Sequence, residues 1–108
     1  MEIKKLADDL GLTPEEFMEL LEIYVKKSNS DMKELKKAID SGNLKDVAVF
    51  AHSLKGASLN MGFEALAENA LGIEAKAKKG VWDGIEEHYA VLIKGYESLN
   101  DEYNNLKK

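Results

Sequence analysis

The sequence predicts an all-α protein, an antiparallel up-down-up-down four-helix bundle with a short extra helix at the N-terminus. Apolar residues recur at intervals of three and four along almost the whole chain, and no stretch alternates with a period of two for long enough to form a strand. The chain has 108 residues, within the range of about 100 to 200 residues that is usual for one domain. We therefore expect residues 1–108 to form a single bundle domain, in which amphipathic helices bury their apolar stripes against one another.

The first two helices are expected on either side of Gly11. A short helix is predicted over Ile3–Leu10, because glycine commonly ends a helix in the left-handed conformation. The stretch Thr13-Pro14-Glu15-Glu16 then predicts a helix start, with threonine as the N-cap, proline at the first helical position and the second glutamate completing a capping box. The apolar stripe keeps its register as far as Ser41. The alternative is a second helix start at Ser30-Asp31.

Glycines also separate the last three helices. Asn43 followed by Asp46 three residues later predicts the start of a helix over Leu44–Met61. The next helix is expected over Phe63–Lys79, and its lysine-rich last turn suits a helix C-terminus. A final helix is expected from about Asp83 towards the end of the chain.

Composition excludes several classes of function. The chain has 15 Lys and Arg against 20 Asp and Glu, a formal charge of -5, so it lacks the basic surface that drives nucleic-acid binding. All the basic residues are lysines, so a side-chain cation meets an anion here as a point charge. The absence of cysteine excludes disulfides and thiolate sites. We find no membrane span and no secretory signal, and expect a cytoplasmic protein.

His52 does not fit the apolar stripe of its helix. It lies about 130° from the middle of that stripe, so its ring should reach water. Gly56, one turn later, costs roughly 1 kcal/mol relative to alanine in a helix interior. The small side chains of Ala48 and Val49 precede the histidine by one turn, and Lys55 follows it. The pattern therefore indicates an accessible imidazole beside a cation.

This arrangement suits the acceptance of a phosphoryl group. An imidazole with an ordinary pKa near 6.5 is largely neutral at pH 7 and presents a nitrogen lone pair. Phosphoryl transfer needs in-line approach and charge stabilisation more than covalent machinery. An exposed histidine without such neighbours usually has no task, and the interpretation depends on Lys55 and Gly56 being in register with His52.

The segment His52-Ser53-Leu54-Lys55-Gly56, followed by Gly62, resembles the H-x-L-K-G-x-x-x-x-x-G motif of histidine-containing phosphotransfer (Hpt) domains. Gly42-Asn43-Leu44 and the residues 62–67 also resemble the turns of that family before and after its active helix, so the resemblance covers most of the chain. It implies a four-helix bundle that takes a phosphoryl group from an aspartyl phosphate of one response-regulator receiver domain and passes it to another.

The resemblance also implies roles for individual residues. His52 is the phosphoacceptor, Lys55 neutralises phosphate charge, Gly56 clears the approach, and Gly62 makes the turn to the next helix. Separately from the resemblance, Ser58, on the apolar stripe of the same helix, is predicted as a further supporting residue. Where some members have a glutamine on the following helix, this chain has Glu74. Its carboxylate is either held away by Lys78 at i+4 or bonds the second imidazole nitrogen, and the sequence leaves both open.

The implied partners are receiver domains and a hybrid sensor histidine kinase, in a two-component phosphorelay. Ala48, Val49 and Leu59, with part of the leading helix, are expected to form the apolar rim that binds a receiver. We expect a monomeric carrier and not an enzyme, without a cofactor, because Mg²⁺ should lie on the receiver.

Two other classes of function stay open: the phosphoacceptor domain of a chemotaxis-type kinase, and an adaptor bundle in which His52 does nothing. His88 has no comparable neighbours and is expected to be a packing or surface residue, and a metal site is not indicated.

Overall fold

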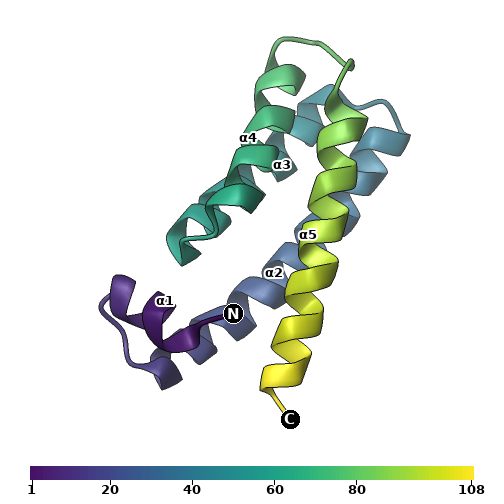
Figure 1. Ribbon diagram of the computed structural model, residues 1–108. Helices are drawn as coiled ribbons and strands as arrows, with labels where there is room; N and C mark the ends of the chain where they lie inside the picture. The colour runs from purple at the N-terminus through teal and green to yellow at the C-terminus, as the bar shows by residue number, and fades with distance from the viewer.

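The computed structural model describes all residues, 1–108, and contains five α-helices and no strands. Figure 1 shows a short N-terminal helix beside the long helix that follows it. This long helix and the three after it form the bundle. The predicted fold class is confirmed. The helices are α1 (Ile3–Asp9), α2 (Pro14–Asp40), α3 (Leu44–Met61), α4 (Glu64–Lys78) and α5 (Ile85–Leu106).

Local capping signals fixed most helix ends correctly. Thr13 forms the predicted capping box with Glu16, whose backbone N–H donates to the threonine hydroxyl at 3.1 Å. The Asn43 side chain accepts a hydrogen bond from the backbone N–H of Asp46. The prediction placed the start of α5 about two residues too early, because Gly84 takes a positive φ of 92° and the chain turns there before the helix begins.

Helix α2 is continuous, so the alternative start at Ser30-Asp31 is wrong. Ser28 lies on the buried stripe and its hydroxyl donates to the carbonyl of Tyr24 one turn earlier at 2.7 Å. The helix therefore continues through its serine-rich segment, because the Ser28 hydroxyl bonds a carbonyl of the same helix and does not cap a new helix.

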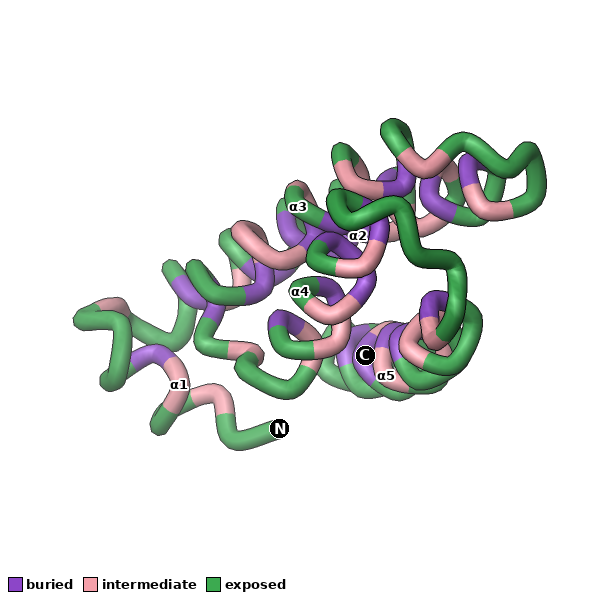
Figure 2. Tube along the Cα trace, turned by 90° about the horizontal axis from the view of Figure 1, so that it is seen from above, coloured by how far each residue is buried: buried purple, intermediate pink, exposed green.

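The four long helices pack in a cycle in which α3 has the largest role. It lies against α2 on one side and α4 on the other, α4 in turn packs on α5, and α5 meets α2 more lightly. Figure 2 shows the buried residues gathered on the sides of the helices that face one another. Helix α1 packs on α2 and places Ala7 in the core. Helix α3 consequently keeps one long side free for solvent.

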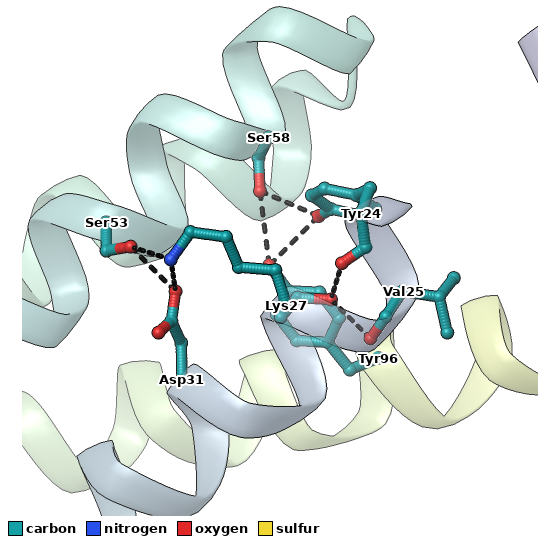
Figure 3. A network of polar contacts seen from close by, with 8 residues as sticks. Tyr24, Val25, Lys27, Asp31, Ser53, Ser58 and Tyr96 are labelled. Carbon is teal, nitrogen blue, oxygen red and sulfur yellow. Dashed lines mark hydrogen bonds and ion pairs between the residues drawn. The ribbon is translucent and has the colours of Figure 1, made fainter. Parts of the chain in front are cut away.

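A ring of three hydroxyl groups joins three of the helices inside the core. Tyr24 Oη lies 2.8 Å from Ser58 Oγ and 2.9 Å from Tyr96 Oη, and the last two atoms are 3.1 Å apart. Figure 3 shows the three side chains converging from α2, α3 and α5. Burial raises the pKa of both tyrosines, so each hydroxyl keeps its proton. Each member donates once and accepts once, which fixes the register of α3 between its neighbours.

Candidate functional site

His52 stands on the outer side of α3, as the sequence predicted. Its side chain is 64% exposed, although its Nδ1 atom lies 2.7 Å from Oε2 of Glu74 on α4. One edge of the ring is therefore held by a neighbouring helix. The opposite edge, which carries Nε2, has no protein partner.

Glu74 is buried, and two lysines compensate its charge. Its side chain is only 3% exposed. Lys55 on α3 places its Nζ 3.0 Å from Oε1, and Lys78 on α4 places its Nζ 3.0 Å from Oε2. Both alternatives that the sequence left open are thus present at once, because Glu74 contacts the imidazole and is also paired with Lys78.

Three donors control the ionisation of Glu74. Burial by itself would raise the pKa of this carboxyl, but the close polar contacts of Lys78, Lys55 and His52, together with the charge of Lys55, outweigh it and lower the pKa to about 2. The group is consequently ionised at neutral pH and can only accept hydrogen bonds. The imidazole must therefore donate from Nδ1, so that in the neutral ring Nε2 carries the lone pair.

The space next to the imidazole is open. Ala48 and Val49 line a shallow hollow together with His52 and Glu74, and Val49 is half exposed. A Cβ placed on Gly56 would meet nothing within 4 Å. No internal packing contact therefore requires a glycine at this interior helix position, and the absent side chain leaves room for a group from outside the molecule.

Comparison with known proteins agrees with this geometry. A scan against protein-family models matches residues 19–108 to the Hpt domain. The chain belongs to the Hpt family. Searches of curated proteins and of solved structures gave no significant match. Hpt domains are phosphocarrier modules of two-component signalling, where they interact with receiver and kinase domains.

In this Hpt domain two of the predicted supporting residues lie away from the histidine. Ser58 is fully buried and belongs to the hydroxyl ring of the core, so it supports the helix and not the site. Gly62 ends α3 with a positive φ of 78° and makes the turn to α4. Leu59 is 55% exposed one turn beyond Lys55, and the two residues line a second hollow against α4. Helix α1, part of which was expected in the apolar rim, packs against α2.

The sequence analysis missed a polar cluster beside the site, which joins α2 to the turn of His52. The hydroxyl of Ser53 donates to Asp31 Oδ2 at 2.7 Å, and Lys27 Nζ contacts the same carboxylate at 3.1 Å and the serine at 3.0 Å. Figure 3 shows these three side chains meeting between the two helices. The signal was the position of Asp31, three residues after Ser28 on the buried stripe, where an apolar residue is usual.

The second histidine has a different environment. His88 is half-buried between α4 and α5, and its Nδ1 lies 3.2 Å from Oδ1 of Asn69. Of the two roles that the sequence left open, packing or surface, the ring has the packing role. No group of three or more His, Cys, Asp or Glu side chains is placed to hold a metal ion. None of the five helices combines the length and apolarity needed to cross a bilayer.

Proposed function

We propose that this Hpt domain accepts a phosphoryl group on Nε2 of His52 from the aspartyl phosphate of one receiver domain and passes it to another. The observation that carries the proposal is the contact between His52 Nδ1 and the ionised Glu74, which leaves Nε2 as the exposed lone pair. The helical frame holds that atom towards solvent on the free side of α3.

In the transfer step, the Nε2 lone pair attacks phosphorus while the bond from phosphorus to the receiver's aspartyl oxygen breaks and its electron pair stays on that carboxylate. Nδ1 keeps its proton, so the ring gains positive charge as the N–P bond forms. Glu74, 2.7 Å from Nδ1, faces that developing charge. Transfer to a second receiver reverses these bond changes, and the chain returns to its starting state.

Lys55 is the cation placed to meet the phosphoryl oxygens. It lies on the same helix as His52, one turn further on, and its Nζ contacts Glu74 Oε1 as an ion pair without a well-aligned hydrogen bond. An ammonium on a flexible four-carbon stem changes partner readily. In the proposal it moves from Glu74 to the phosphoryl group during the reaction.

The proposed receiver surface surrounds the imidazole. Val49 and Leu59 are half exposed before and after His52, and Ala48 lines the hollow beside the imidazole together with Val49. Gly56 lets the acidic loop of the receiver come close. Mg²⁺, which we expect on the receiver, supplies most of the charge stabilisation, and this chain supplies the nucleophile, so it acts as a carrier rather than as an enzyme.

The test is incubation with a phosphorylated receiver and Mg²⁺. We expect the wild-type chain to gain an acid-labile phosphoryl group, His52→Gln to gain none, and His88→Gln to behave as wild type. Label on the His52→Gln variant would refute the assignment of the acceptor, and an unlabelled wild type would refute the function.

The same assay separates the other classes that the sequence left open. A phosphoacceptor domain of a chemotaxis-type kinase would be labelled by an ATP-dependent kinase and not by a receiver. An adaptor bundle would be labelled by neither. A hybrid sensor kinase carrying its own receiver serves as the donor in a second arm, and label that depends on that receiver supports the phosphorelay.

A further inference from the structure

Lys78 is the contact of Glu74 that lies outside the phosphoacceptor motif. Its Nζ is 3.0 Å from Oε2, the oxygen that His52 Nδ1 approaches at 2.7 Å. The lysine side chain is 65% exposed, whereas the carboxylate is almost completely buried. Two donors from different helices thus share one buried oxygen, and Lys78 reaches it from the solvent side.

The carboxylate that orients the imidazole also favours protonation of the ring, which would prevent the reaction. A negative charge within about 4–6 Å of a histidine favours the protonated ring. A protonated imidazole has no lone pair on Nε2 and cannot attack phosphorus. Glu74 therefore serves the reaction only when nearby cations offset its charge.

The charged groups around His52 are few and come from three helices. Helix α4 supplies Glu74 and Lys78, and α3 supplies Lys55. On α2, the charged side chains at this level, Lys27 and Asp31, pair with each other and with Ser53. One negative charge at the imidazole thus faces two positive charges, one from each of α3 and α4.

Lys55 and Lys78 have different roles in the proposed reaction. In the function proposed above, Lys55 turns towards the phosphoryl oxygens and gives up its place at Glu74. Lys78 is then the cation that remains on the carboxylate. We propose that Lys78 is a positioning residue that acts through Glu74, offsetting the carboxylate charge so that His52 stays neutral and presents the Nε2 lone pair. This inference rests on the proposed function of His52.

The first arm of the test needs no partner protein. The ring of His52 is titrated by NMR in the unphosphorylated wild type, in Lys78→Met and in Lys79→Met, a matched control that removes the same charge at the same helix end. His88 is an internal reference in every sample. We expect the ratio of protonated to neutral His52 at a given pH to rise about threefold to fivefold in Lys78→Met, and to stay at the wild-type value in Lys79→Met and in Lys78→Arg.

The second arm measures phosphoryl acceptance from a phosphorylated receiver as a function of pH. The Lys78→Met variant should accept the group about threefold more slowly near pH 7, and should reach the wild-type rate at alkaline pH, where the ring is neutral in both proteins. Lys78→Gln is a second variant with the same expectation. A merely structural role of Lys78 would not produce a defect that disappears at high pH.

Two results would overturn the inference. One is a Lys78→Met protein whose His52 titration coincides with that of Lys79→Met. The other is an acceptance defect of equal size at every pH, which would place Lys78 in contact with the receiver instead. If the wild type accepts no phosphoryl group, the proposed function fails, and the titration alone still decides the role of Lys78.

Discussion

The two histidines of this chain lie in regions that differ in structure. Each has a glycine of a helix interior near it: Gly56 lies one turn after His52 on α3, whereas Gly72 lies on α4, against the His88 ring of α5. A Cβ on Gly72 would lie 2.8 Å from the His88 ring, whereas a Cβ on Gly56 would meet nothing. Gly72 makes room for a side chain of the molecule itself. Gly56 leaves space that no side chain of the molecule fills, as expected where a partner approaches.

The side chains that contact the two imidazole rings also differ. His88 meets a neutral amide, Asn69, between two packed helices. His52 meets a buried carboxylate whose charge is held by two lysines, and most of its ring is in water. Either acceptor can fix the tautomer of an imidazole, but only the carboxylate also stabilises positive charge on the ring.

Removal of the charged partner should have the largest effect. Glu74→Ala leaves Nδ1 of His52 without an acceptor, so the ring no longer favours the tautomer with the lone pair on Nε2. We expect phosphoryl acceptance to fall about tenfold to a hundredfold, the range typical of groups that orient a functional imidazole. Asn69→Ala, which removes the partner of His88, is the control and should keep the wild-type rate in the same receiver assay. Equal rates for the two variants would contradict the contrast.

Acid should weaken the carboxylate site. Because the folded protein holds the pKa of Glu74 at about 2, below its ordinary value of 4.5, the group contributes stability above pH 4.5 that is lost as the pH falls towards 2. Allowing for the exposed side of Lys78, we expect the wild type to lose about 2 kcal/mol more than Glu74→Gln over that window. Urea unfolding of both proteins at pH 6 and pH 2.5 measures the difference. Parallel losses would show that the ion pairs contribute nothing to the fold.

Gly56→Ala should separate stability from function. Alanine in the helix interior should raise the free energy of unfolding by about 0.5–1 kcal/mol, since nothing in the chain opposes the added methyl group. The same methyl group narrows the approach to Nε2, and we expect acceptance to fall about tenfold, a change of 1.4 kcal/mol in the barrier. Urea unfolding and the receiver assay on one preparation check both. A destabilised variant, or one with unchanged transfer, would contradict the reading of Gly56.

Gly72→Ala should behave in the opposite way. Its methyl group meets the His88 ring, so we expect the free energy of unfolding to fall by about 1 kcal/mol after the gain in helix propensity is counted. Transfer should be unaffected. In a His88→Ala background the same change should become stabilising, and a double-mutant cycle by urea unfolding would show this coupling. Additive effects would mean that the ring is not what fills the space at Gly72.

The elements that the sequence predicted well depend on local signals. The N-cap residues and glycine turns lie within a few residues of the helix ends that they mark, and α2, α3 and α4 begin and end within about one residue of their expected places. The outward direction of His52 followed from helical geometry alone. Both kinds of inference need no knowledge of which helix lies beside which.

The features that the sequence left open depend on contacts between helices. Whether Glu74 meets Lys78, His52 or both is set by the register of α4 against α3. The cluster of Asp31 with Ser53 likewise requires α2 and α3 to be aligned. Ser58 shares a helix with His52 but is fully buried, and its hydroxyl contacts Tyr24 and Tyr96 of the core rather than the site. The spacing of residues in the sequence predicts on which face of a helix a side chain lies, whereas the packing of the helices decides which residues it contacts.

The position of the phosphoryl group in the phosphorylated chain shows which nitrogen of His52 reacts. NMR of the ¹⁵N-labelled protein after transfer from a receiver identifies which ring nitrogen is bonded to phosphorus. We predict a single N–P bond at Nε2 of His52, with Nδ1 still protonated and close to Glu74. Phosphorus on Nδ1 of His52, on His88 or on a hydroxyl group would contradict the central claim that Glu74 selects the nitrogen that reacts.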